Sequence, residues 1–537
     1  MIQACAAPKI SRALTATSNT AVTDNLTQTQ RRTLKKMGVE AKSGETDKVY
    51  LSADKDTAYV AVTLSQYHTM WNSHTSTGPY TEVDYFAVDW ERYRHESIRL
   101  ATEALSAGLI SVEEHRFVTK DCRGPIRVPV GNLMVKTHKL VNLYAIHPDP
   151  VASSRAYIDT VNYVTTAWAR FLSVKLTPAR QNIPHRIMDT ADFISKLRRQ
   201  RFSQDCWLVS ADVVEFYPNT DPAEGDGVIL DHIPPELVQL CLSVAKLIHQ
   251  SIKVITPLGC FDMSGGYGIG LAHSGEMCDL NWAKLEQTIF AALAQLNLFA
   301  AFWGRLVDDY FLVLDGPIAD RHKIIDALKR ADPKRPLKVQ ISSQQIDFLD
   351  VTVYKGPQFL TTGILDTKPY TKPSFTGMHL PYSSHHPQST FSSILSGYHN
   401  RSLISSSSRV NHVTCMLAKL DSFKHRGYPY RILKHWLLQE SCWKEQTFKR
   451  ERERKLKKKL RERVNRIIPL KLQYTPRSES LSRYLDVSTL QKSIQKTIPA
   501  LSRVSLGKIT VCNLKTKNLM EAIRPTGHLL NVSLDDL

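Results

Sequence analysis

Residues 206–217 read CWLVSADVVEFY and residues 302–314 read FWGRLVDDYFLVL, and these two apolar segments decide the fold class. The first is a β-branched run with Asp212 near its end, which predicts a buried strand. The second predicts two strands around a tight turn that holds Asp308 and Asp309. An Asp-Asp pair is usually only a turn, but burying two adjacent carboxylates in an apolar hairpin without a metal is unfavourable. The hairpin therefore indicates a functional site.

Helical patterns separate these two segments, and a further strand pattern follows them. The helical patterns cover 236–251 and 277–296, and the strand pattern, IDFLDVTVYKG, covers 346–356. A strand with an acid, a helix, and a hairpin with two acids follow one another in the order of a βαβ-like palm. The expected fold class is therefore α/β (α+β).

Upstream of the palm, the pattern is mainly helical. The spacing of Ala and Leu predicts a helix over 85–118. Residues 122–130 are expected to form a short extended segment, because a glycine and two prolines interrupt them. Residues 160–176 predict an amphipathic helix that Pro178 stops.

Composition bounds the kind of partner. The 537 residues include 70 Lys and Arg against 51 Asp and Glu, so the formal net charge is +19. Such an excess favours a polyanion as partner, nucleic acid before an anionic membrane surface, although a basic but inert surface is the alternative. No apolar run approaches about 18 residues, which excludes a membrane span. Nine cysteines without a CxxC pair predict reduced thiols in an intracellular protein rather than a zinc ribbon.

Two segments of the chain are strongly or purely basic, one at its start and one within the last hundred residues. The first twenty residues carry Lys9 and Arg12 and no acid, which fits either an organelle transit peptide or, as we prefer, a disordered basic tail. Residues 443–466 hold twelve Lys and Arg against four Glu. This segment predicts a helix that contacts nucleic-acid backbone, or else a solvated helix or a nuclear-import signal. The candidate contacts are Lys455, Lys457, Lys458, Lys459 and Arg461.

The acids suit one particular chemistry. Nucleotidyl transfer uses two Mg²⁺ ions about 4 Å apart that clamp the attacking and the leaving oxygen. Hard cations prefer carboxylate oxygens. A carboxylate at a strand end, Asp212, and two in a neighbouring hairpin, Asp308 and Asp309, would supply them.

Four segments, in order along the chain, resemble the motifs of reverse transcriptases. SADVVEFYPNTD at 210–221 resembles motif A, and RLVDDYFLV at 305–313 resembles motif C. GGYGIGLAHSGEMCDLNWAKLE at 265–286 resembles motif B, a glycine-rich turn followed by a helix. RPLKVQIS at 335–342 resembles motif D.

Further landmarks resemble the Penelope-like retroelements. VGNLMVKTHK at 130–139 is similar to that family's Leu-Pro-Lys-Ile-His-Lys signature, and 346–356 to its Phe-Leu-Asp strand. Residues 368–387, KPYTKPSFTGMHLPYSSHHP, resemble its Tyr-Arg-Lys-Pro and Ser-Ser-His-Pro segment. HRGYP at 425–429 and KNLMEAIRP at 517–525 resemble downstream landmarks, so the resemblance covers about 120 to 525.

The chain departs from the family pattern at several positions. Asp149 stands where an Arg that helps to hold the triphosphate is usual, and Leu306 stands where motif C usually has an aromatic residue. Leu271 and Ala272 replace the Ser-Pro of motif B. No GIY-YIG endonuclease pattern follows residue 525, which suggests an endonuclease-lacking, truncated or domesticated copy.

The resemblance implies an RNA-directed DNA polymerase, a nucleotidyltransferase that extends a DNA primer on an RNA template with dNTPs. It implies two Mg²⁺ ions held by Asp212, Asp308 and Asp309, with Lys338 assisting the leaving pyrophosphate. The residues that it implies at the nucleotide are Tyr217 as the steric gate, Phe216, Gly266, Gly270, Lys136, Lys139 and Arg155. A polymerase-inactive RNA- or hybrid-binding protein and a maturase-like RNA factor are the alternatives.

The resemblance also implies a right-hand polymerase with fingers, palm and thumb, in an intracellular, nuclear setting without a membrane partner. The expected parts are a disordered basic tail (1–45), a helical N-terminal extension (46–120), fingers (121–205), palm (206–356), primer grip and thumb (357–440) and a basic helical C-terminal extension (441–537).

Overall fold

The computed structural model describes residues 48–54, 59–137, 153–263, 265–372, 379–384, 386, 388–437, 468–473 and 509–514. These residues fall into two compact units. The larger unit is built from residues 47–376 with 404–411, and the smaller one contains the described residues of 377–403 and 412–528. Helices and sheets occur together, so the mixed α/β class expected from the sequence is confirmed.

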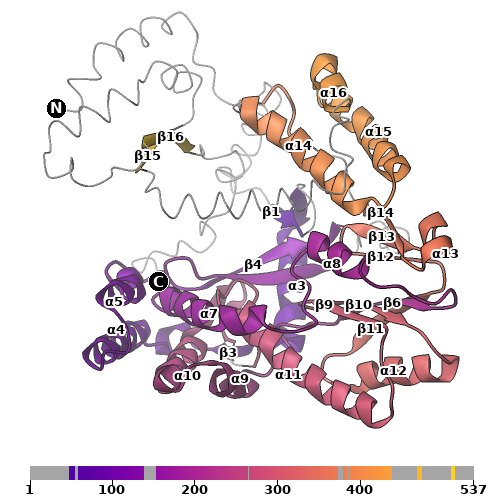
Figure 1. Ribbon diagram of the computed structural model, residues 1–537. Helices are drawn as coiled ribbons and strands as arrows, with labels where there is room; N and C mark the ends of the chain where they lie inside the picture. The colour runs from indigo at the N-terminus through magenta and orange to yellow at the C-terminus, as the bar shows by residue number, and fades with distance from the viewer. Residues whose placement is uncertain are drawn as a thin grey trace, which may run out of the picture. The chain divides into compact units, whose positions relative to one another are not determined.

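The segment predicted as the palm contains a four-stranded antiparallel sheet, here called the palm sheet, in the order β11-β6-β10-β9 (Figure 1). Its strands are β6 (Trp207–Val213), β9 (Phe302–Leu306), β10 (Asp309–Leu314) and β11 (Leu337–Ser342). The helices between β6 and β9 are α9 (Gly225–His232), α10 (Pro235–Ser251) and α11 (Ser274–Gln295). Because β10 runs antiparallel to both β6 and β9, it separates two parallel strands, which makes a split βαβ unit. The strand, helix and hairpin predictions for this region are confirmed.

The alternation of side chains along these strands gives the palm sheet two covered faces. Val209 and Ala211 of β6 and Leu312 of β10 belong to the main core, together with residues of α7, α10 and α11. Phe311 and Val313 point the other way, into a second core that contains Phe193. Both faces are therefore apolar over most of the sheet, and the polar positions gather at one end of β6 and β10.

A seven-stranded sheet lies upstream, in the order β2-β1-β4-β7-β8-β3, with β5 on the other edge of β4. Its strands are β1 (Lys48–Ala53), β2 (Tyr59–Thr63), β3 (Thr81–Val83), β4 (Val130–Val135), β5 (Ser154–Asp159), β7 (Lys253–Thr256) and β8 (Gly259–Asp262). The expectation that 46–120 is helical is therefore wrong for β1, β2 and β3. In β1, Val49, Leu51 and Ala53 are buried and alternate with partly exposed residues with a period of two. β7 and β8, expected in the palm, join this sheet instead.

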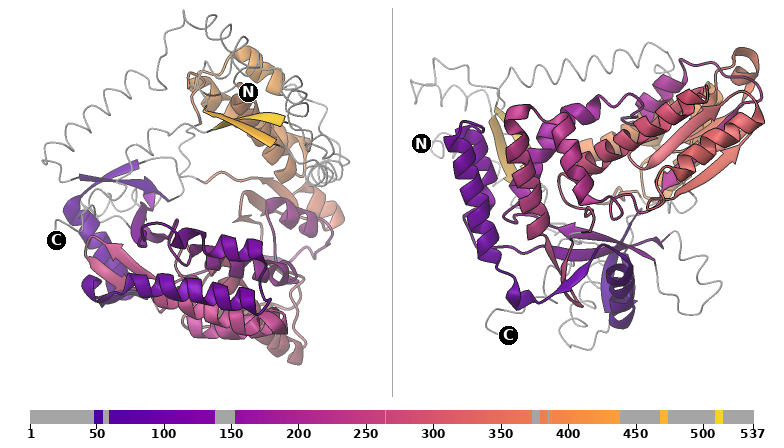
Figure 2. Two further views of the ribbon diagram at one scale, coloured as in Figure 1. Left: turned by 90° about the vertical axis from the view of Figure 1, so that its left-hand side faces the viewer. Right: turned by 90° about the horizontal axis from the view of Figure 1, so that it is seen from below.

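Helices of the upstream region differ from the predicted ones at their breaks. They are α3 (Leu64–Thr77), α4 (Trp90–Ser106), α5 (Val112–Val118), α7 (Thr166–Gln181) and α8 (Thr190–Leu197), with 3₁₀ turns at Tyr85–Ala87, Lys120–Cys122 and Pro222–Glu224. The single helix predicted over 85–118 is two helices, because Gly108 takes φ +70° after α4. Pro178 does not stop α7, since it lies in the last turn, where it removes one hydrogen bond. α7 packs along α11 (Figures 1 and 2).

The strand predicted over 346–356 is a hairpin, β12 (Gln345–Phe348) and β13 (Val351–Tyr354), turned at Leu349 with φ +54°. β14 (Asp366–Pro369) adds a third strand to it. The helices on either side are α12 (Ile318–Arg330) and α13 (Pro357–Thr362). The prediction of one strand failed because the turn consists of Leu349 and Asp350, and a single Asp inside an apolar run does not by itself reveal a turn.

The smaller unit contains three helices among its described residues. Its helices are α14 (Gln388–Ser405), α15 (Arg409–His425) and α16 (Tyr430–Leu437), of which residues 404–411 belong to the larger unit. Phe391, Phe423 and Trp436 pack in its core. Two short parallel strands, β15 (Ile468–Gln473) and β16 (Ile509–Leu514), pair further along the chain. Within the described ranges, no helix has the length and apolar character that crossing a membrane requires.

Candidate active site

Three of the predicted site residues form one row across the palm sheet. Asp212 of β6 is the direct partner of Asp309 of β10 and, on its other side, of Lys338 of β11. Direct partners in adjacent antiparallel strands project to the same face, with Cβ atoms about 5 Å apart. Asp212 and Lys338 are exposed and Asp309 is half-buried. The sheet therefore brings together two carboxylates and an ammonium group that lie far apart in the sequence.

The third carboxylate, Asp308, lies in the two-residue turn between β9 and β10. Val307, the other turn residue, has φ +59°. This left-handed conformation is unfavourable for a β-branched residue, by about 1–3 kcal/mol. The amide of Val213, at the end of β6, donates to the carbonyl of Asp308 over 3.0 Å. The turn is therefore tied to the strand that carries Asp212.

The three acids fit a hard divalent cation by their donor chemistry. Among the described residues, no three His, Cys, Asp or Glu side chains already gather as a closed metal cage. Mg²⁺ does not need one, because it is usually held by one or two carboxylates together with waters and substrate phosphates. Asp212, Asp308 and Asp309 provide carboxylate oxygens only, with no soft sulfur ligand among them.

Tyr217 and Phe216 have different surroundings. Burial raises the pKa of the half-buried Tyr217 to about 12, and the neighbouring Cys278 and Asp308 act in the same direction. Tyr217 is therefore close to the acidic turn and stays neutral at physiological pH. Phe216 is buried and packs edge-on against Trp282 at 5.7 Å between ring centroids. The expectation that Phe216 contacts a nucleotide is therefore wrong, because its ring is buried in the core.

The glycines of motif B allow close approaches within the chain itself. A Cβ atom on Gly266 would lie 2.0 Å from the carbonyl oxygen of Pro218. Gly270 has φ +113°, and a Cβ there would lie 2.1 Å from the carbonyl oxygen of Ile158. The amide of Ile158 also donates to the carbonyl of Ile269 over 2.8 Å. The loop is thus clamped between the motif A turn and β5, whereas the sequence predicted an approach to template and nucleotide.

The cations predicted to hold the triphosphate are only partly described. Arg155 of β5 pairs with Asp54, with 3.3 Å between Nε and Oδ1, and the Asp54 side chain is 3% exposed. Lys136 follows β4 and is half-buried, with its amide bonded to Ser153. Lys139, Asp149 and the basic segment with Lys455, Lys457, Lys458, Lys459 and Arg461 lie outside the described residues.

A buried charge network beneath the acids was missed in the sequence. Arg305 of β9 is 1% exposed, and its Nε lies 2.9 Å from Oε2 of Glu286 on α11. It also pairs with Asp279, which accepts from Nε of Arg180 over 2.7 Å. Burial alone would raise the pKa of the Asp279 carboxyl, but the charges of Arg305 and Arg180 hold it below its ordinary value. Two features of the sequence could have revealed this network. Asp279 and Glu286 stand seven residues apart in an apolar helical pattern, and Arg305 stands inside an apolar strand.

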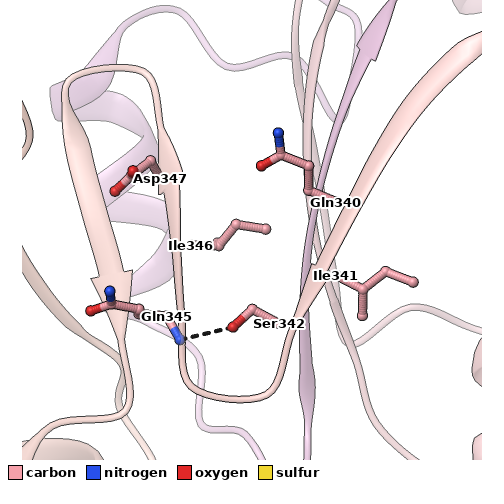
Figure 3. Close-up of a pocket in the computed structure, with 6 residues that line it drawn as sticks. All are labelled: Gln340, Ile341, Ser342, Gln345, Ile346 and Asp347. Atoms are coloured by element: carbon pink, nitrogen blue, oxygen red, sulfur yellow. Dashed lines mark hydrogen bonds between the residues drawn. The ribbon is translucent and has the colours of Figure 1, made fainter. Parts of the chain in front are cut away.

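One small recess lies away from this row. It opens between β11 and β12 at the end of β11 opposite to Lys338, where the Ser342 hydroxyl accepts from the Gln345 amide over 3.1 Å (Figure 3). Its lining residues are Gln340, Ile341, Ser342, Gln345, Ile346 and Asp347. We assign it no part in the chemistry of the acids.

Comparison with known proteins finds likenesses among solved structures alone, since no family model and no curated protein matches the chain. Telomerase from Candida albicans, in complex with a fragment of telomeric RNA, is 11% identical, with a TM-score of 0.43 over 71% of this chain and 63% of that one. Apo telomerase from Candida tropicalis is 12% identical, with a TM-score of 0.40 over 70% of this chain and 66% of that one. The RNA-dependent RNA polymerase of BmCPV is 13% identical, with a TM-score of 0.35 over 67% of this chain and 31% of that one. The chain spans less than two thirds of the first telomerase, so we argue its function from its own residues.

Proposed function

We propose that the chain is an RNA-directed DNA polymerase of the Penelope-like reverse-transcriptase type, extending a DNA primer on an RNA template. The observation that carries this proposal is the direct register of Asp212 with Asp309, with Asp308 in the adjoining turn. The order of the segments that resemble motifs A to D supports it. The basic excess of the chain supports a nucleic-acid partner.

The row of residues suits phosphoryl transfer, in which catalysis is mainly positioning and neutralisation of charge. Asp212, Asp308 and Asp309 would hold Mg²⁺, which when bound stabilises the attacking and the leaving oxygen. Lys338 lies beside Asp212 on the next strand, so its ammonium is available to a leaving pyrophosphate. The strand ladder fixes the backbones of Asp212, Asp309 and Lys338 relative to one another.

Tyr217 would choose the sugar. Its ring lies near Asp308, where the residue resembling the family's steric gate is expected, and its hydroxyl is 4.0 Å from the position of a Cβ on Gly275. A ring held there by packing would clash with a ribose 2′-hydroxyl and favour dNTPs.

Primer extension tests the proposal. The purified chain is given a labelled DNA primer on an RNA template with dNTPs and Mg²⁺, and hybrid binding is measured in parallel by fluorescence anisotropy. Asp212→Asn and Asp309→Asn should abolish extension and leave hybrid binding within about two-fold, because only the reacting centre changes. Asp231→Asn on α9 is the matched control, since it removes an exposed carboxylate that pairs with the exposed Lys284 and lies outside the palm sheet. Undiminished extension by either palm variant would refute the assignment.

One observation favours a second candidate, a polymerase-inactive RNA- or hybrid-binding protein. Arg155, which could replace the arginine missing at Asp149, is already paired with the buried carboxylate of Asp54. Tight hybrid binding without extension, unaffected by Asp212→Asn, would identify this candidate. An activity that remodels RNA without dNTPs would instead indicate a maturase-like factor.

A further inference from the structure

The turn that carries Asp308 has a strained backbone, which contacts from outside the turn must stabilise. Val307 keeps φ +59° although it is β-branched, and such a conformation persists only where the surroundings enforce it. The carbonyl of Val307 accepts a hydrogen bond from Nη1 of Arg305 over 2.8 Å. Arg305 thus reaches from β9 around its own turn and holds the strained peptide.

Arg305 is itself fixed on several sides. Its amide donates to the carbonyl of His185, and its carbonyl accepts from the amide of Ile187 over 2.7 Å. Its guanidinium pairs with Asp279 and Glu286, both on α11. With 1% exposure, the side chain has no solvent to replace these partners.

The carboxylate of Glu286 holds the other side of the same turn. Its Oε1 accepts from the hydroxyl of Tyr310 over 2.8 Å, and Tyr310 directly follows Asp309. Trp303 also donates to Oε1 over 3.2 Å. Arg305 therefore acts on the residue before Asp308, and Glu286 acts on the residue after Asp309.

The network also reaches α7 and the segment after it. Asp279 is shared by Arg305, Arg180 and Arg186, and Arg180 bonds Glu276 over 2.9 Å. Arg180 belongs to α7, in the segment predicted as the fingers. Buried charges of opposite sign thus compensate one another, which removes the penalty that an unpaired buried guanidinium would bring.

We infer that Arg305 is a positioning residue for the carboxylates of Asp308 and Asp309, acting through the Val307 peptide and through Glu286. This inference rests on the proposed polymerase function. A residue needed only for folding would affect stability alone, whereas a positioning residue affects the acids beyond its effect on stability.

A second buried arginine provides the matched control. Arg321 of α12 is also 1% exposed, and it holds the opposite end of β10 by bonds to the carbonyls of Gly316 (2.8 Å) and Asp205 (2.7 Å) and to the Asp205 carboxylate. Replacement by lysine keeps the charge at either position and removes the planar fork that makes several bonds at once. Only Arg305→Lys loosens the acidic turn.

The experiment compares Arg305→Lys and Arg321→Lys in the full chain by three measurements. These are thermal unfolding, Mn²⁺ affinity from the free-ion electron paramagnetic resonance signal, and single-nucleotide extension. Arg305→Lys should lower kcat by about ten-fold or more with KM for dNTP changed less than about three-fold, because displacements near one ångström can lower rates by about 100-fold. It should also weaken Mn²⁺ binding several-fold, while Arg321→Lys lowers the unfolding temperature without either change.

Replacing Val307 by glycine tests the inference independently. Glycine adopts positive φ readily, so Arg305→Lys combined with Val307→Gly should recover part of the lost kcat and Mn²⁺ affinity. If Arg305→Lys does not fold, Glu286→Gln replaces it with the same expectations. Equal effects of the arginine variants on kcat and Mn²⁺ affinity, or no rescue by glycine, would overturn the inference. If the parent chain does not extend primers, the polymerase proposal fails, and Mn²⁺ affinity alone decides whether Arg305 positions the acids.

Discussion

Replacing Gly270 by alanine should destabilise the larger unit far more than replacing Gly108. Gly270 has φ +113°, and its missing Cβ would lie 2.1 Å from the carbonyl oxygen of Ile158 and 3.2 Å from its amide nitrogen. Gly108 has φ +70° with nothing within 4 Å of its missing Cβ. The two substitutions are chemically identical, and both put a side chain in a backbone conformation that favours glycine. They differ in what the new methyl group meets.

The expected magnitudes follow from these contacts. The strained conformation contributes about 1–2 kcal/mol at either site. At Gly270, β5 and the motif B loop must also separate, which breaks the hydrogen bond between Ile158 and Ile269, worth about 1 kcal/mol, and opens packing worth about 1–2 kcal/mol more. We therefore expect the free energy of unfolding to fall by about 3–5 kcal/mol for Gly270→Ala and by about 1–2 kcal/mol for Gly108→Ala.

Urea denaturation followed by tryptophan fluorescence measures both changes, with primer extension as a second readout. Gly270→Ala should also slow extension, because its loop contacts the turn after Asp212. Equal decreases in the free energy of unfolding for the two variants, within about 0.5 kcal/mol, would refute the reasoning.

Three further predictions concern sugar choice, acid stability and the basic segment. Tyr217→Ala should raise the ratio of rNTP to dNTP incorporation, while Tyr217→Phe, which keeps the ring, should not; equal ratios for all three proteins would remove the gate role. Burial lowers the pKa of His249 to about 4, so the unfolded chain binds its proton first and stability should fall as pH drops from about 6.5 towards 4, by about 2 kcal/mol at pH 5. His249→Gln should flatten this fall in urea midpoints measured across that range. Changing Lys455, Lys457, Lys458 and Lys459 to Gln should reduce the salt dependence of hybrid binding, by about 0.9 in slope for each phosphate that is no longer neutralised; an unchanged slope would place the duplex elsewhere.

Local pattern predicted the palm strands and the acids because the relevant signals are short-range. The β-branched run around Asp212 and the apolar run around Asp308 each occupy about a dozen residues, and β6, β9 and β10 formed where expected. Which residue of β6 faces which residue of β10 depends on packing across the core, however. No local pattern predicts that Lys338 pairs with Asp212, and the strand that carries Lys338 was expected only as a segment resembling motif D.

The failures have the same physical origin. Pro178 ends a helix in isolation, but Trp168, Leu172 and Leu176 bury one face of α7 and carry it past the proline. The sequence shows that Arg305 is an unexpected charge in an apolar strand, but it does not identify its partners, because Asp279 and Glu286 come from a helix. Phe216 follows the same rule: its motif places it near a nucleotide, and packing with Trp282 draws it into the core.

The split βαβ arrangement makes the separation of Asp212 and Asp309 independent of the length of chain that connects them. Their spacing is set by the hydrogen-bonded pairing of β6 with β10, so lengthening the connection between α9 and α10 beside the exposed Pro234 should leave the acids in place. Adding a single residue inside β10 would have the opposite effect, since every side chain beyond it would turn to the other face of the sheet. The strands are thus sensitive to insertion, whereas the short connection between α9 and α10 is expected to tolerate it, so differences in length should concentrate there rather than in the strands.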